Sequence, residues 1–221
     1  MKMHKSFIVL MFLVGLTFET EFIDVVERGD LYSVQEMLRK NRNLVGEIDE
    51  AGNTALVYAA WKGHTKIVEF LIESDANVNH AGKFGTTALS AAAVEGHADP
   101  VKFLINARAD VNLGSDDGYT PLIDAACGNW VEVVAILIEA GADTKRALDW
   151  AVSYSHRGAV ELLVLSGANT TGIRDNGMIE SAVRKKLNIE FSVFSSFAQA
   201  LHDDYSDLIA VVRETITLAQ M

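Results

Sequence analysis

Cysteine is almost absent from this chain, which has 221 residues and a single cysteine, Cys127. One thiol cannot form an intramolecular disulfide, nor can it supply the paired cysteines of a Cys-x-x-Cys redox or metal site. We therefore expect packing alone to hold the fold together. Cys127 itself is interpreted as a small, partly buried hydrophobic residue.

Long basic runs are also missing after the first few residues. The sequence has 30 acidic residues against 19 lysines and arginines, which gives a formal net charge of −11 at pH 7. A surface of this sign repels the phosphate backbone of nucleic acids and anionic lipid surfaces. The composition therefore disfavours nucleic acid as a partner.

Motifs for catalysis and cofactor binding are absent as well. The sequence contains no Gly-x-Ser-x-Gly, Walker-type loop or His-Glu-x-x-His motif and no Cys/His dyad. The acidic pairs Asp116-Asp117 and Asp203-Asp204 lack the surroundings of a calcium loop, so we interpret them as solvated charges. We predict no enzyme, no cofactor and no metal site.

The first 18 residues have the composition of a secretory signal peptide. Lys2, His4 and Lys5 precede an apolar run over residues 7–16, which is too short to span a bilayer as a stable helix. We predict a signal peptide over residues 1–18, and a secreted or periplasmic protein whose mature chain has no membrane span. The alternative is an uncleaved first helix packed on the rest of a cytoplasmic protein.

A repeat with a period of 33 residues organises the middle of the chain. Gly52-Asn-Thr-Ala-Leu56 recurs as Gly85-Thr-Thr-Ala-Leu89 and as Gly118-Tyr-Thr-Pro-Leu122. Paired alanines and apolar residues at helical spacing follow each motif in the same register. At these residues the chain resembles the ankyrin-repeat family over about residues 20–169. The resemblance implies an all-α repeat solenoid of helix-turn-helix units with β-hairpin fingers.

The register divides the chain into five units and a C-terminal segment. In the last unit the matching positions lie 26 residues after their counterparts, so we predict that its finger is deleted. After residue 169 the period is lost, and we expect a helical cap with a helix over 178–187, two further apolar helical stripes, and a possible short strand over 189–193. The predicted boundaries are 20–48 for a degenerate N-terminal unit, 49–81, 82–114, 115–144 and 145–169 for the repeats, and 170–221 for the cap.

Several repeat positions have a specific physical role. Thr54, Thr87 and Thr120 are expected to cap the first helix of their units. Leu71 and Leu104 are expected in the core. His64, His97 and His156 lie at equivalent positions, but units about 10 Å apart cannot bring three imidazoles onto one ion, so we predict hydrogen bonds to turn backbone.

The end of each second helix is where the family places a glycine, because the backbone there is left-handed. Gly141 and Gly167 follow this rule. Asp75 and Arg108 occupy the same position in the earlier units. We therefore expect both residues to be strained or shifted, Asp75 less than Arg108.

The resemblance places partner binding in a concave groove between the fingers and the first helices. Four aromatic residues are predicted to line one face there, and exposed aromatics are typical of binding hot spots; the alternative is that each one shields its own repeat. Trp130 and Trp150 are expected to be packing residues. The predicted partner-binding residues are Glu50, Asn53, Lys83, Phe84, Thr86, Asp116, Asp117 and Tyr119 on the fingers, and Trp61, Lys62, Glu95 and Tyr154 on the first helices.

These features predict a protein–protein interaction module that is monomeric when free and acts as an exported adaptor or inhibitor. A first alternative is an ankyrin targeting scaffold for an unrecognised activity in the C-terminal segment. A second is a cytosolic or host-directed interaction protein.

Overall fold

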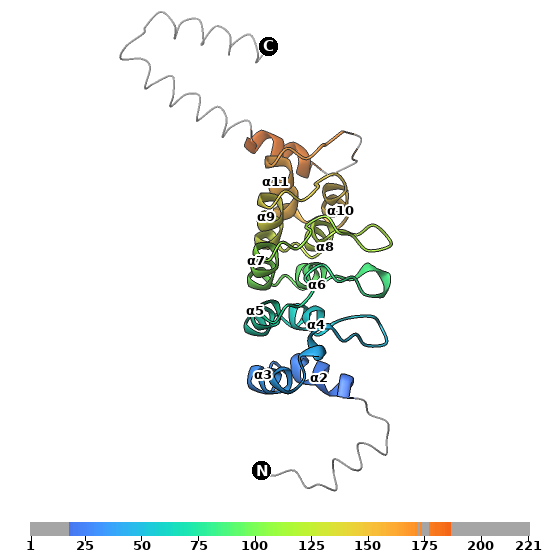
Figure 1. Cartoon of the computed structure of the whole chain (residues 1–221). Helices are drawn as coiled ribbons and strands as arrows, with labels where there is room; N and C mark the ends of the chain where they lie inside the picture. The colour runs from blue at the N-terminus through green and yellow to red at the C-terminus, as the bar shows by residue number, and fades with distance from the viewer. Residues whose placement is uncertain (1–17, 172, 174–176, 187–221) are drawn as a thin grey trace, which may run out of the picture.

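A computed structural model of the chain describes residues 18–171, 173 and 177–186. Figure 1 shows the helices stacked in pairs along one direction, with the fingers projecting from one side. The predicted all-α repeat solenoid is therefore confirmed. The pairs are α2 (Phe18–Glu27) with α3 (Leu31–Lys40), α4 (Ala55–Trp61) with α5 (Thr65–Glu73), α6 (Ala88–Val94) with α7 (Ala98–Asn106), α8 (Pro121–Cys127) with α9 (Val131–Glu139), and α10 (Ala147–Ser153) with α11 (Arg157–Leu165).

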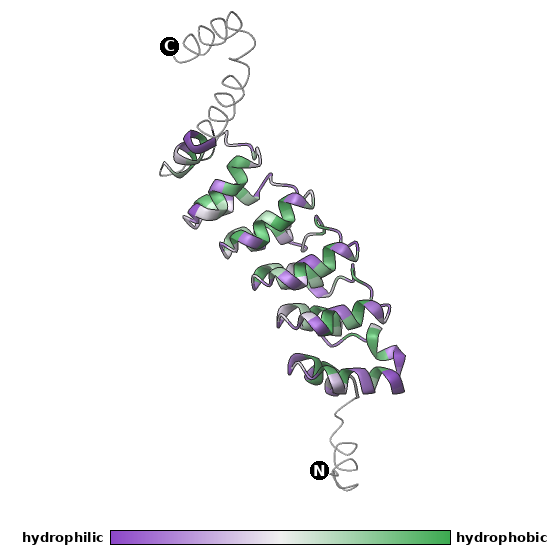
Figure 2. Ribbon diagram, turned by 90° about the vertical axis from the view of Figure 1, so that its left-hand side faces the viewer, coloured by the Kyte–Doolittle hydropathy of each residue, from purple (hydrophilic) through white to green (hydrophobic). Residues whose placement is uncertain are grey.

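The even-numbered helices form an inner column beside the fingers, and the odd-numbered helices form an outer column (Figure 1). The connections between pairs include the 3-10 turns η1 (Arg42–Gly46) and η2 (Lys83–Gly85). Figure 2 shows apolar segments recurring in each pair, while hydrophilic residues gather in turns and at helix ends. One pair cannot bury its apolar faces alone, so stacking must supply the stability.

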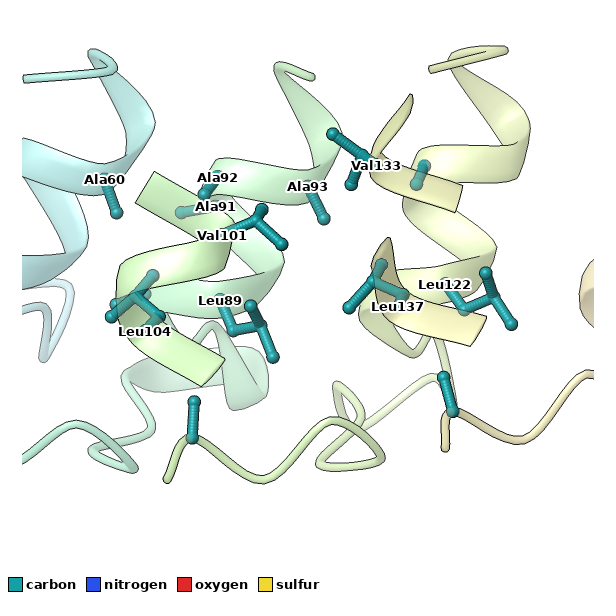
Figure 3. Close-up of a cluster of buried hydrophobic side chains, with 14 of the residues drawn as sticks. Ala60, Leu89, Ala91, Ala92, Ala93, Val101, Leu104, Leu122, Val133 and Leu137 are labelled. Atoms are coloured by element: carbon teal, nitrogen blue, oxygen red, sulfur yellow. The ribbon is translucent and has the colours of Figure 1, made fainter. Parts of the chain in front are cut away.

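The core runs continuously through the stack. Leu71, Leu104 and Leu137 of the outer helices are fully buried, and burying one such side chain stabilises the fold by about 1.5–3 kcal/mol. The paired alanines of the inner helices, such as Ala92 and Ala93, are also fully buried and let neighbouring helices approach closely. Figure 3 shows Leu104, Leu137, Ala92 and Ala93 in one cluster of buried side chains that extends through successive units.

The threonine caps form in two units out of three. Thr87 and Ser90 make a reciprocal capping box, and the Thr120 hydroxyl accepts from the backbone N–H of Ile123 at 3.4 Å. The cap predicted for Thr54 is wrong, because its hydroxyl makes no cap hydrogen bond. There the backbone N–H of Val57 donates to the Thr54 carbonyl oxygen instead, at 3.0 Å.

The turns within the helix pairs form an edge of the stack, which we call the turn edge (residues 29–30, 63–64, 96–97, 129–130 and 155–156). The imidazole Nε2 of His64 lies 2.9 Å from the Glu27 carbonyl oxygen, and that of His97 lies 3.0 Å from the Trp61 carbonyl oxygen. Trp130 takes the next equivalent position, and its indole N–H donates to the Val94 carbonyl oxygen at 2.9 Å. The histidines thus bond to backbone as predicted, but the carbonyl groups belong to the ends of the preceding unit's first helices rather than to turns.

The last step of the turn edge departs from this pattern. A Cβ built on Gly63 would lie 2.8 Å from the ring of His97, yet the equivalent residue in the fourth unit is Asn129, at φ 54°. His156 then uses Nδ1, which lies 3.0 Å from the Ala126 carbonyl oxygen. The Asn129 side chain accepts from the backbone N–H of Ala159 at 3.3 Å, which links the two units in another way.

The ends of the second helices adopt the left-handed conformation that the sequence predicts. Asp75 and Arg108 have φ values of 67° and 66°, and Gly141 and Gly167 have 85° and 93°. The two non-glycine residues are therefore strained in place rather than shifted.

The C-terminal segment is described in part. A helix over residues 178–186 follows the last repeat, and its Met178 and Ala182 are buried in the same cluster as Leu163. The helix predicted over 178–187 is therefore confirmed over residues 178–186, and residue 187 lies outside the described residues. The two further helical stripes, the alternative strand, the pair Asp203-Asp204 and the signal segment up to residue 17 lie outside the described residues.

No helix in the described part of the chain is long and apolar enough to cross a membrane.

Candidate functional site

Three fingers, at residues 49–53, 82–86 and 115–119, project from the inner column. Each is closed by a backbone hydrogen bond between its ends: Asp49 N–H to Asn53, Gly82 N–H to Thr86, and Ser115 N–H to Tyr119, at 2.8–3.0 Å. The predicted β-hairpins are not confirmed, since the described residues contain one isolated antiparallel bridge, Ile48 with Thr54 at the base of the first finger, and no extended ladder. The surface formed by these fingers and the exposed sides of α4, α6, α8 and α10 is called the finger face.

Backbone hydrogen bonds hold the fingers against one another. The Lys83 N–H donates to the Ala51 carbonyl oxygen at 2.9 Å, and the Asp116 N–H donates to the Phe84 carbonyl oxygen at 3.1 Å. Only residues 140–146 connect α9 to α10, so the fourth unit ends without a comparable loop. Arg146 contacts the third finger there, donating to the Gly118 carbonyl oxygen at 3.0 Å.

Phe84 stands out on the second finger. It occupies the third position of its turn with φ 68°, a conformation that suits glycine and is strained for a bulky residue. Its side chain is 76% exposed. An exposed aromatic held in a strained turn contributes little to the core, and such strain concentrates at functional sites.

One cluster on the finger face lies at its N-terminal end, and its polar atoms are paired. The Trp61 indole N–H donates to Glu95 at 2.8 Å, and the Lys62 ammonium lies 5.2 Å from the centre of the Trp61 ring and 3.6 Å from Glu27. The Tyr58 hydroxyl donates to Asp49 at 2.5 Å. Burial, and then the hydrogen bond to Asp49, raise the pKa of Tyr58.

A second cluster lies at the C-terminal end and is built of stacked rings. The ring centres of Tyr119 and Trp150 are 5.1 Å apart, those of Trp150 and Tyr154 are 6.1 Å apart, and those of Tyr154 and His156 are 5.8 Å apart. Trp150 is half-buried and joins two aromatics that the sequence analysis assigned to the face. Trp150 was predicted to be a packing residue only. It also connects the third finger to α10 through its contact with Tyr119.

Asp124 lies on α8 at the repeat position that Tyr58 has in α4 and Trp150 has in α10. It is half-buried, and burial raises the pKa of its carboxyl to about 7. Cys127, one turn further along, is also half-buried, and burial followed by the Asp124 charge raises the pKa of its thiol. At neutral pH this thiol is a small apolar lining residue, as the sequence suggested.

The structure places all the predicted partner-binding residues outside the core. It brings Trp61, Lys62 and Glu95 together, and the Lys83 ammonium donates to the Glu50 carbonyl oxygen. Tyr58, Asp124 and Trp150 were not among the residues predicted to bind a partner. They occupy the same position in their repeats, and this shared position could have identified them. The exposed members are Glu50, Trp61, Lys62, Lys83, Phe84, Glu95, Asp116, Asp117 and Tyr154, and the half-buried ones are Asn53, Thr86 and Tyr119.

In the residues that the structure describes, no group of three or more His, Cys, Asp or Glu side chains is placed to hold a metal ion. The aligned histidines are each occupied by a separate backbone carbonyl. The described finger face presents aromatic rings, charged side chains and the backbone of the fingers.

Stacked helix pairs with loops on one side define a repeat solenoid that presents an extended surface. The family model for ankyrin repeats (3 copies) matches residues 22–115 and again residues 101–173, and the chain belongs to the ankyrin-repeat family. Such repeats indicate a protein-interaction module, and the family is generally not enzymatic.

A curated relative matches a short stretch of the chain. It is an acyl-CoA-binding domain-containing protein 6 homolog from Dictyostelium discoideum, 36% identical over 53 residues, which is 24% of this chain and 18% of the relative. The chain thus spans less than a fifth of that protein by alignment, and the likeness extends to no more than that stretch.

Proposed function

We propose that this protein binds a folded protein partner through the finger face and acts as an adaptor or inhibitor. The observation that carries the proposal is the set of aromatic side chains exposed on one side of the stack. Trp61, Phe84 and Tyr154 are 44%, 76% and 55% exposed. Aromatic residues of this kind dominate the energetics of protein interfaces.

The fingers support the proposal because their backbone is preorganised. Their turns are closed by short backbone bonds, and neighbouring fingers are bonded to one another. A surface that is already ordered loses little conformational entropy on binding. The strain at Phe84 is consistent with selection for what its side chain contacts rather than for stability.

The test is affinity selection of partners with the full chain and with matched variants. A partner of the finger face is captured by the wild-type protein and by Tyr32→Ala, whose side chain is 73% exposed on the outer helix α3. The Trp61→Ala/Tyr119→Ala double variant should lose that partner while keeping its melting temperature. Equal capture by all three proteins would contradict the proposal.

We also propose that residues 1–18 direct export. The support is the basic start and the short apolar run of the sequence. N-terminal sequencing of the protein produced from the full chain tests this. A mature chain that still begins at Met1 favours the cytosolic or host-directed alternative.

A further inference from the structure

The carboxylate of Asp124 has no counter-charge in the described structure. Burial is what raises its pKa, and no neighbouring cation lowers it. Removing a carboxylate from water without a partner destabilises its charged form. A half-buried acid is therefore kept on the finger face without a charged partner among the described residues.

The way α8 begins gives Tyr119 and Asp124 related positions at the start of the helix. Thr120 is the N-cap, so Tyr119 directly precedes the cap and Asp124 is the fourth helical residue, two positions whose side chains meet at a helix start. The equivalent positions in the second unit are occupied by Asn53 and Tyr58. The relation between the two positions favours an approach of the Tyr119 ring to the Asp124 side chain.

Trp150 completes the surroundings from the next unit. It occupies in α10 the position of Asp124 in α8, and these two helices pack directly on each other. Its ring centre lies 5.1 Å from that of Tyr119. Two aromatic rings and one carboxylate therefore gather where the third finger meets the inner column.

We propose that Tyr119, Asp124 and Trp150 form a socket for a lysine or arginine side chain of the protein partner. This inference rests on the proposed function and names the chemistry of the partner. A cation is attracted by the faces of Trp and Tyr rings, and it supplies the charge that the Asp124 carboxylate lacks. The exposed Asp116 and Asp117 on the same finger add to the attraction.

The N-terminal cluster shows what a filled site of this kind looks like. There Lys62 of the chain itself lies 5.2 Å from the Trp61 ring centre, and Glu95 accepts from the indole. The C-terminal cluster has the rings and the acid, and Arg146, a base beside the third finger, donates to the Gly118 carbonyl oxygen at 3.0 Å. Among the described residues no cation is paired with Asp124, and we assign that place to a cation of the partner.

The experiment is selection of a phage-displayed random peptide library on the full-length protein. Affinities of the selected peptides are then measured on the wild type, on Asp124→Asn, on Tyr119→Ala and on the control Asp99→Asn, which removes an exposed carboxylate from the outer helix α7. We expect the peptides to share a lysine or arginine, and Asp124→Asn to weaken them by about tenfold or more. Asp99→Asn should leave the affinity unchanged.

Replacing the shared basic residue of a peptide tests the same contact without changing the protein. Citrulline in place of arginine, or norleucine in place of lysine, should weaken binding to the wild type about as much as Asp124→Asn does, and the two changes together should add little. The peptide replacements are measured on the wild-type protein, so they remain informative even if Asp124→Asn folds poorly.

Two outcomes separate the failure of the socket from the failure of the finger face. Peptides that lose affinity with Tyr119→Ala, yet lack a shared basic residue and bind Asp124→Asn normally, overturn the socket and leave the proposed function standing. Peptides that bind all the variants equally overturn both.

Discussion

The turn edge and the finger face belong to the same repeats, but they differ in how closely one unit copies the next. At the turn edge His64, His97 and Trp130 send the same kind of hydrogen bond to the preceding unit, even though the residue type changes. On the finger face one repeat position is Tyr58, then Ala91, Asp124 and Trp150, each with different contacts. Stacking fixes the first surface, while the second is free to differ and can therefore specify a partner.

The largest effect is expected where the repeats are most alike. Leu104 is fully buried between units, and Leu104→Ala should lower the free energy of unfolding by about 2–5 kcal/mol through the cavity it leaves. Urea unfolding followed by circular dichroism measures the loss. Phe103→Ala, a change at a partly exposed neighbour, should cost less. Similar losses for both variants would contradict the assignment of the packed side.

The finger face should respond in binding rather than in stability. Trp61→Ala and Tyr119→Ala are each expected to weaken partner binding by about 1–4 kcal/mol, the scale of interface hot spots, with little change in melting temperature. Titration calorimetry against a captured partner, paired with thermal melts, separates the two effects. If either variant unfolds instead, that residue belongs to the core, and its assignment to the finger face is wrong.

Asp124 adds a pH dependence that is confined to the finger face. Because its folded-state pKa is about 7 and the unfolded value is about 3.9, the folded state binds the extra proton. Its contribution to stability therefore falls as the pH rises from about 4 to about 7 and stays low above that range.

Asp124→Asn should abolish this dependence. The shift corresponds to at most about 4 kcal/mol, and the water that reaches a half-buried group reduces it, so we expect a gain of about 1–2 kcal/mol at pH 8 and almost none at pH 4. Urea unfolding at both values tests this, with Asp99→Asn as the control. A gain that is equal at the two pH values would exclude an uncompensated carboxylate.

The sequence predicted the core and the turn edge better than it predicted the finger face. The register located the core leucines, the histidine bonds and the left-handed positions, because stacking imposes them on every unit. It missed the shape of the fingers, because tight turns closed by Asp49 or Ser115 need no alternating strand pattern. It also missed the pairing of Tyr119 with Trp150, which arises because the shortened fourth connection lets α10 meet the third finger.

The smallest effect is expected for Arg108, which lies at the end of an outer helix, away from the finger face. Arg108 has φ 66° at a position where Gly141 takes the same conformation with open space around its missing Cβ. Arg108→Gly should therefore stabilise the fold by about 1 kcal/mol, the strain of a left-handed residue with a side chain, less the extra freedom of glycine in the unfolded chain.

Arg108→Ala is the matched control, because it removes the same charge and length but keeps the Cβ. Thermal melts should rank the glycine variant above the wild type and the alanine variant near the wild type. The backbone carbonyl of Arg108, which accepts from the Asn79 amide at 3.3 Å, remains available in both variants. A lower melting temperature for Arg108→Gly refutes the strain argument. Unchanged stability with weaker partner binding would instead assign the Arg108 side chain to the interface, and the binding surface would then extend beyond the finger face to the ends of the outer helices.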